Sequence, residues 1–179
     1  VFSKNSECIV QDTDILSLAN ISNEIHHEVE LAIIIGKKGK NIKEDEAQDY
    51  IFGSAIALDL TLRDIQSKAK KNGTPWYLSK SFDNSCPMTS VFKIASIEKL
   101  ENIDLYIKVN GEIKQIGNTS RMIYKIPYLI SYISTFCTLY PGDVILTGTP
   151  EGVGPIYNGD ILEFGSESYE IETMKVSIK

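Results

Sequence analysis

The ten residues HHEVELAIII, from His26 to Ile35, decide the fold of this chain. From Val29 onward the segment is almost wholly aliphatic and largely β-branched, which is typical of a strand with both faces buried. Successive side chains of a strand point to opposite faces, so Glu28 and Glu30 share one face and the alternate apolar residues the other. The Cα atoms of the two glutamates would lie about 6.6 Å apart, close enough for both carboxylates to reach one cation. The segment therefore predicts a core strand over Val29–Ile35 with two acids at its start.

A second apolar run, Phe52–Leu60, predicts another buried strand and carries Asp59 near its end. A pair of glutamates alone is most simply a solvated strand face, because such pairs are common. An unpaired carboxylate on a buried strand is costly, however, so Asp59 requires a cation or hydrogen-bond donors. Two Glu and one Asp favour a hard ion such as Mg²⁺, Mn²⁺ or Ca²⁺ over zinc. His26 and His27 could add a ligand or a supporting donor, with a purely structural role as the alternative.

Strand patterns also dominate the second half of the chain. The dipeptide Asn110-Gly111 predicts a type I′ hairpin turn, because both turn positions need positive φ. Its two strands would be Asp104–Val109 and Glu112–Ile116. The remaining predicted strands, each bounded by Gly, Pro or Asn, are Pro87–Ile94, Val144–Thr147, Asp160–Phe164 and Tyr169–Ile178.

Helices are fewer. Thr61 is predicted to cap a helix that runs through Lys71 and ends at Asn72-Gly73. A second helix should begin near Pro127 and stop before Pro141-Gly142, and a short one should cover Glu44–Tyr50. The predicted buried face of the second helix is formed by Tyr128, Ile130, Ile133, Phe136 and Cys137. Together these elements predict one α+β domain with a strand-rich core.

Composition excludes several classes of function. The 179 residues suffice for one domain with a sizeable core, and 18 Lys+Arg against 24 Asp+Glu give a net charge of −6. This balance argues against nucleic acid as a partner. Cys8, Cys86 and Cys137 form no CxxC pair, which indicates free, buried thiols in a reducing compartment. No apolar stretch reaches the roughly 20 residues of a bilayer span, so no membrane partner is expected.

Four blocks of sequence carry a more specific pattern. They occur in the order His26–Leu31, Leu58–Gln66, Trp76–Asp83 and Gly142–Pro155. Together they resemble the fumarylacetoacetate hydrolase family, most closely its small acylpyruvase and oxaloacetate decarboxylase branch, over nearly the whole chain. The resemblance implies a mixed β-roll with a few short helices and a homodimer. It also implies that Glu28, Glu30 and Asp59 hold Mg²⁺ or Mn²⁺, with Ca²⁺ as a substitute.

The resemblance further implies a substrate class and the residues that contact it. Family members cleave or decarboxylate 2,4-dioxo acids, and Arg63, Gln66 and Lys80 would face the substrate's carboxylate and oxo groups while Thr149 closes the pocket. Arg63 and Gln66 lie three residues apart and so share a helix face. A guanidinium suits a carboxylate and a lysine suits a developing oxyanion. A solvated surface is the alternative for all three. The Gly148–Pro155 loop could line an anion site with its amides or form a plain turn.

The expected reaction is acylpyruvate hydrolysis. Water would attack the 4-carbonyl, and cleavage of the C3–C4 bond would leave a pyruvate enolate that the metal and Lys80 stabilise. Oxaloacetate decarboxylation passes through the same enolate. The family activates water with a His–Glu pair on an N-terminal lid. No such pair occurs here, so we expect residues 1–179 to be one catalytic domain without the lid and the base to lie upstream of Val1.

Two alternatives stay open. An isomerase or decarboxylase needs only enolate chemistry and tolerates loss of the lid, whereas an inactive metal-binding member would result if the N-terminal segment were truly absent. The cysteine pattern indicates an intracellular rather than secreted protein, either cytoplasmic or mitochondrial.

Overall fold

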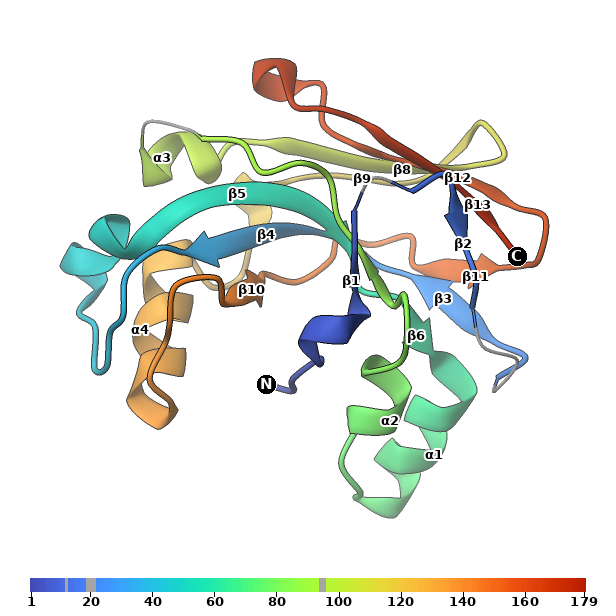
Figure 1. The fold of residues 1–179 in the computed structure, drawn as a ribbon, viewed down its shortest axis with the longest axis horizontal. Coiled ribbons are helices and arrows are strands. Elements are labelled where there is room, and N and C mark those ends of the chain that lie inside the picture. The colour runs from blue at the N-terminus through green and yellow to red at the C-terminus, as the bar shows by residue number, and fades with distance from the viewer. Residues whose placement is uncertain (12, 19–21, 94–95) are drawn as a thin grey trace.

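A computed structural model describes residues 1–11, 13–18, 22–93 and 96–179 (Figure 1). Its strands are β1 (Ile9–Val10), β2 (Ile15–Leu16), β3 (Ile25–His27), β4 (Val29–Ile35), β5 (Ile51–Leu58), β6 (Thr61–Leu62), β7 (Cys86–Pro87), β8 (Asp104–Val109), β9 (Glu112–Asn118), β10 (Val144–Leu146), β11 (Gly154–Ile156), β12 (Ile161–Gly165) and β13 (Met174–Ile178). Its α-helices are α1 (Arg63–Asn72), α2 (Tyr77–Lys80), α3 (Ile97–Leu100) and α4 (Ile126–Phe136). The short 3₁₀ helices are η1 (Ser6–Cys8), η2 (Glu44–Tyr50), η3 (Thr119–Arg121) and η4 (Ser168–Glu170).

Strand β4 has the predicted bounds and lies at the centre of the fold. It pairs antiparallel with β5 on one side and with β10 on the other. Its odd-numbered residues, from Val29 to Ile35, belong to the main hydrophobic core, which also contains Ile107 and Phe164 of the five-stranded sheet. Its even-numbered residues face a smaller apolar cluster that includes Cys86. The predicted alternation is therefore confirmed, and the even-numbered face is the one that carries Glu30.

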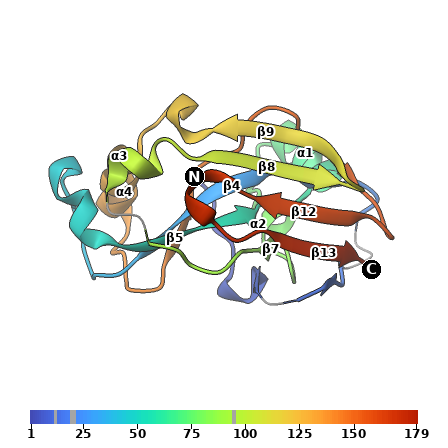
Figure 2. The same cartoon turned by 90° about the horizontal axis from the view of Figure 1, so that it is seen from above.

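A five-stranded sheet in the order β2-β13-β12-β8-β9 covers the β4–β5 layer. Figure 2, seen from above, shows β8, β12 and β13 running across β4 and β5. The hairpin between β8 and β9 turns at Asn110 (φ 53°) and Gly111 (φ 81°), as a type I′ turn requires. Strand β8 has the predicted bounds, and β9 continues two residues beyond the predicted Ile116. The strand-rich α+β class is confirmed.

Helix α1 ends as predicted but begins differently. Gly73 closes it in the left-handed region at φ 64°, where a residue without Cβ is unstrained. The predicted cap at Thr61 is wrong, because Leu62 occupies the capping position and makes no side-chain cap. Thr61 lies in β6, and its hydroxyl donates to the carbonyl of Asp59. Helix α1 therefore starts one residue later than predicted, with Arg63 as its first residue.

Helix α4 contains Pro127 in its first turn as predicted, but only part of its predicted buried face is confirmed. The predicted Ile130 is buried and Ile133 packs against the core, together with the buried Ile126 and Ser134. The predicted Tyr128, Phe136 and Cys137 are exposed instead. Along the outer face, Tyr128 stacks on Tyr124 and Tyr132, with 5.0 Å between the ring centroids of Tyr124 and Tyr128, and Phe136 meets Tyr132 edge-on. These aromatic side chains pack against one another at the surface. Aromatic residues at helical spacing therefore did not indicate the buried face of this helix.

Three other predictions need correction. The strand predicted over Pro87–Ile94 is reduced to β7 and isolated bridges at Met88 and Phe92, and Ile94 lies outside the described residues. The strand predicted over Tyr169–Ile178 starts only at Met174, because Tyr169 has φ 57° and interrupts an extended backbone. The predicted Glu44–Tyr50 helix has those bounds but is of the 3₁₀ type.

The other predicted strand ends agree within two residues. Cys8 and Cys86 are free and buried as expected, whereas Cys137 is free but exposed. Within the described ranges, every helix is too short or too polar to traverse a bilayer.

Candidate metal centre and active site

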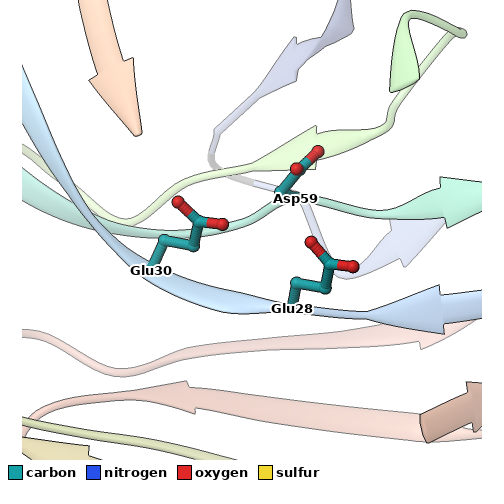
Figure 3. A group of neighbouring side chains, drawn as sticks. All are labelled: Glu28, Glu30 and Asp59. Carbon is teal, nitrogen blue, oxygen red and sulfur yellow. The ribbon is translucent and has the colours of Figure 1, made fainter. Parts of the chain in front are cut away.

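Three carboxylates meet where β4 begins and β5 ends. Glu28 precedes β4, Glu30 is its second residue, and Asp59 follows β5 directly. The amide of Asp59 donates to the carbonyl of Glu28 at 2.8 Å, which ties the two strand ends together. One oxygen from each carboxylate lies within 4.8 Å of the others, and all three side chains are buried. Figure 3 shows the side chains of Glu28 and Glu30 on one segment of backbone and that of Asp59 on the neighbouring segment.

Lys80, at the end of α2, inserts its ammonium group between two of these acids. Its Nζ lies 2.9 Å from Glu28 Oε2 and also donates to Asp59 Oδ2 and to the hydroxyl of Thr61. Only 2% of the side chain is exposed. A charge buried this deeply must be paired and hydrogen-bonded, and the carboxylates provide both. Lys80 is therefore not an ordinary surface lysine.

Lys4 places a second, partly buried cation at the same site. Its Nζ lies 2.8 Å from Asp59 Oδ1 and donates as well to the backbone carbonyls of Leu60 and Lys80. Asp59 is thus bracketed by two ammonium groups, one on each carboxylate oxygen. Lys4 was not predicted, because an isolated lysine near the start of the chain carries no recognisable pattern.

Arg63 and Gln66 face the cluster from α1. The Arg63 guanidinium contacts Glu28 Oε1 and donates to Gln66 Oε1 at 2.6 Å. The predicted shared helix face is confirmed. His26 lies beside the guanidinium, with its Nδ1 3.4 Å from Arg63 Nε and its Nε2 3.2 Å from Glu24 Oε1. His26 therefore supports Arg63 rather than joining the carboxylates.

The two glutamates differ in their electrostatics. Burial tends to raise the pKa of Glu28, but Lys80 and Arg63 outweigh it and hold that pKa below its ordinary value. Burial and the nearby Asp59 charge raise the pKa of Glu30 to about 8. Among the residues that the structure describes, the hydrogen-bond partner of its carboxylate is the amide of Gly148, which donates to Oε2 at 2.6 Å. Glu30 is thus a buried acid whose ionised form a bound cation would stabilise.

Thr149 lies one residue beyond that contact but outside the carboxylate network. Its hydroxyl donates to the carbonyl of Val29 at 2.8 Å and accepts from Nε2 of Gln115 at 2.8 Å. Its predicted contact with substrate stays a prediction. Thr149 also lines a hollow of about 380 Å³, together with Met122, Tyr124 and Pro150, and the carboxylates are not among the lining residues.

Gln115 and His27 complete this second network. Gln115 Oε1 accepts from His27 Nδ1 at 2.8 Å, and burial lowers the pKa of His27. The Nδ1 of His27 is therefore hydrogen-bonded to Gln115 and not to the three carboxylates. Sequence reasoning missed Gln115, since a lone glutamine between Lys114 and Ile116 in a hairpin strand carries no recognisable pattern.

The donor set fits a divalent cation. Three carboxylates supply only oxygen, which hard ions prefer, and few protein ligands leave coordination positions for water and an oxo acid. Glu30 supports the fit, because burial and the Asp59 charge disfavour its ionised form, which a bound cation would stabilise.

The sequence profile of the fumarylacetoacetate (FAA) hydrolase C-terminal region matches residues 1–177. The chain belongs to the fumarylacetoacetate hydrolase family. It is 46% identical over 165 residues to the mitochondrial oxaloacetate tautomerase FAHD1 of Arabidopsis thaliana, covering 92% of this chain and 74% of that protein. It is 47% identical over 160 residues to the mitochondrial oxaloacetate decarboxylase of Dictyostelium discoideum, covering 89% of this chain and 73% of that protein.

A solved structure of the fumarylacetoacetate hydrolase family has the same fold. The fumarylpyruvate hydrolase of Pseudomonas aeruginosa, in complex with Mn²⁺ and pyruvate, superposes with a TM-score of 0.92 at 30% sequence identity. The superposition covers 99% of this chain and 77% of that one. The fold and the enzyme family are thereby established, and relatives within the family include a tautomerase, a decarboxylase and a hydrolase.

Proposed function

We propose that this protein is a divalent-metal-dependent enzyme that enolises oxaloacetate and decarboxylates it. The observation that carries the proposal is the buried ammonium group of Lys80, held 2.9 Å from Glu28 at the edge of a three-carboxylate cluster. Enolisation and decarboxylation of a 2-oxo acid both develop negative charge on the oxo oxygen, and a fixed cation lowers the energy of that charge. The names of the relatives at 46% and 47% identity support the choice of oxaloacetate.

Each residue of the cluster has a role in this proposal. Glu28, Glu30 and Asp59 would hold Mg²⁺ or Mn²⁺, and the bound ion would act as a Lewis acid on the substrate's oxo group. Lys80 would donate a hydrogen bond to the oxygen that becomes negative. Its contacts with Glu28 and Asp59 fix the ammonium group before substrate arrives, so little reorganisation is needed.

Substrate orientation would come from the first turn of α1. The Arg63 guanidinium offers a planar pair of donors that suits a carboxylate. Gln66 accepts from one end of that guanidinium and Glu28 holds the other, which leaves the group little freedom to rotate. Arg63 would thus orient the acid while Lys80 faces the oxo oxygen.

Acylpyruvate hydrolysis is the second candidate. The similarity to the fumarylpyruvate hydrolase, whose structure contains Mn²⁺ and pyruvate, favours it. Hydrolysis would use the same enolate stabilisation at Lys80 and would need a base that activates water. That base, and its place upstream of Val1, stays a prediction.

One set of assays on the full-length protein separates these activities. The protein would be stripped of metal and then supplied with Mg²⁺ or Mn²⁺. Enol–keto conversion and CO₂ release would be followed with oxaloacetate, and pyruvate release with acetylpyruvate. We expect metal-dependent turnover of oxaloacetate. Turnover of acetylpyruvate alone would support the second candidate, and undiminished oxaloacetate turnover in the presence of chelator would reject the metal-dependent proposal.

Assembly and location are proposed separately. We propose a homodimer, for which light scattering would give twice the chain mass of 20.0 kDa. We also propose a mitochondrial location, because the tautomerase and decarboxylase relatives are named as mitochondrial proteins. Fractionation of cells that express the full-length protein tests the second point.

A further inference from the structure

Gln115 makes four hydrogen bonds with a single buried amide. Its Oε1 accepts from the amide of Val29 at 3.1 Å and from His27 Nδ1 at 2.8 Å. Its Nε2 donates to Thr149 Oγ1 at 2.8 Å and to the carbonyl of Pro150 at 2.9 Å. An amide has two acceptor sites and two donor hydrogens, so every one of them is used. The side chain is 1% exposed, which leaves water no part in this arrangement.

Backbone groups fix the direction of these bonds. The Val29 amide can only donate and the Pro150 carbonyl can only accept, so the oxygen and nitrogen of Gln115 cannot be exchanged. The Thr149 hydroxyl, which receives one proton from Gln115, must therefore give its own to the carbonyl of Val29. The network admits one arrangement.

Gln115 thus joins two segments that are remote in sequence. One is the β3–β4 junction at His27 and Val29, between which Glu28 lies. The other is the segment Thr147–Pro150, whose Gly148 donates to Glu30 at 2.6 Å. A displacement of the second segment would move that amide away from the carboxylate.

Close backbone packing between β9 and the loop after β10 supports the connection independently. A Cβ added at Gly117 would lie 2.7 Å from Pro150 Cβ, and one added at Gly152 would lie 2.3 Å from the carbonyl oxygen of Lys114. Gly152 also has φ 96°, a conformation that side chains disfavour. The loop therefore touches β9 on both sides of Gln115.

We propose that Gln115 is a positioning residue that holds Thr147–Pro150 against the carboxylate cluster and thereby sets the orientation in which Glu30 meets a divalent cation. The effect on metal binding rests on the proposed metal site. The holding of Thr147–Pro150 by Gln115 does not depend on that site. Outer groups that orient a ligand contribute about 10- to 100-fold to metal affinity.

The test uses Gln115→Met, which keeps the length of the side chain and removes all four hydrogen bonds. Thr119→Val is the matched control, because Thr119 is also buried, follows the same strand and makes two buried hydrogen bonds. Their partners are Ile103 and Leu100 and not the segment Thr147–Pro150. Thr149→Val removes one link of the network and stands in for Gln115→Met if that variant fails to fold.

Two readouts distinguish positioning from stability. In metal-free protein, amide exchange of Gly148 should accelerate about fivefold or more in Gln115→Met and in Thr149→Val, but not in Thr119→Val. Titration with Mn²⁺ alone should show a Kd raised about 10- to 100-fold in the same two variants. The double variant Gln115→Met/Thr149→Val should bind Mn²⁺ no more weakly than whichever single variant binds it more weakly, because both substitutions act through one segment.

Unchanged Gly148 exchange in both variants would overturn the inference. Unchanged Mn²⁺ affinity, with a melting temperature lowered as in Thr119→Val, would also overturn it by leaving Gln115 a structural role only. If the wild-type protein bound no Mn²⁺, the proposed metal site would fail, and the exchange measurement would still decide whether Gln115 holds the loop.

Discussion

Lys80 Nζ lies 2.9 Å from Glu28 Oε2, and this buried ion pair connects helix α2 to the start of β4. The same ammonium group contacts Asp59, so one cation serves two of the three clustered acids. A cation in this place can stabilise charge on a substrate, but it also competes with a metal for the same oxygens. Substitution of Lys80 separates the two effects.

Lys80→Met should lower oxaloacetate turnover about 100-fold or more, because a fixed donor to a developing oxyanion typically contributes that much. Mn²⁺ affinity should not weaken, because the variant removes a positive charge from beside Glu28 and Asp59. Lys108→Met, which breaks a lysine–glutamate pair in the five-stranded sheet, is the control. If Mn²⁺ affinity fell in parallel with turnover, the role of Lys80 would instead be to maintain the arrangement of the carboxylate cluster.

Asp59→Asn should abolish Mg²⁺-dependent turnover, since it removes one of three anionic ligands while keeping the side-chain shape. It also leaves Lys4 and Lys80 without their shared carboxylate, and breaking a buried ion pair costs about 3–5 kcal/mol of stability. Kinetics with added Mg²⁺ and denaturant unfolding measure the two effects. Asp143→Asn, which alters an exposed loop contact to the Tyr140 amide, should change neither. Retained metal-dependent activity would remove Asp59 from the metal site.

Metal binding should release a proton from Glu30. Its pKa of about 8 means that the carboxyl is mostly protonated at pH 7 in the metal-free protein, whereas a ligand must be ionised. Calorimetric titration with Mn²⁺ in buffers of different ionisation enthalpy should show proton release that approaches one per site at pH 7 and vanishes near pH 9.5. Glu30→Gln should abolish the release. Release that is absent at pH 7 in the wild-type protein would contradict the assignment.

The same residue predicts how the metal-free protein depends on pH. The pKa of Glu30 is raised on folding from 4.5 to about 8, so its contribution to stability is complete below pH 4.5 and is lost as pH rises to about 8. Over that window it should lower the free energy of unfolding by at most about 1.4 kcal/mol per pH unit. Glu30→Gln should flatten this decline in urea unfolding curves measured at several pH values with chelator present. An unchanged slope would show that Glu30 does not carry the dependence.

The central strand and its acids were predictable because the information is local. Period-two alternation placed Glu28 and Glu30 on one face, and a buried carboxylate at the end of an apolar run singled out Asp59. The Asn110-Gly111 turn likewise follows from the backbone geometry of two residues.

Residues that reach the site from elsewhere in the fold were not predictable in this way. Lys4 meets a partner 55 residues away, and Gln115 bonds to His27 across 88 residues. Neither has a neighbouring residue that reveals its role. The prediction of the buried face of α4 was partly wrong for a different reason. Tyr128 stacks on Tyr124 and Tyr132 instead of entering the core.

Arg63 offers the sharpest test of substrate orientation. Its guanidinium spans Glu28 Oε1 and Gln66 Oε1, a geometry that a single ammonium group cannot reproduce. If Arg63 binds the substrate carboxylate, Arg63→Ala should weaken inhibition by oxalate at least tenfold, and Arg63→Lys should recover only part of that loss. The measurement is the oxalate inhibition constant against oxaloacetate at saturating Mg²⁺.

Arg121→Ala is the control for Arg63, because it removes an exposed arginine that lines the separate hollow beside Thr149. Oxalate also chelates divalent ions, so the Mn²⁺ affinity of each variant must be measured without inhibitor. An oxalate constant that is unchanged in Arg63→Ala, with Mn²⁺ affinity intact, would exclude Arg63 from substrate binding. If the oxalate inhibition constant of Arg63→Ala changed only in proportion to its Mn²⁺ affinity, the role of Arg63 would be to hold Glu28, since the two side chains are in direct contact.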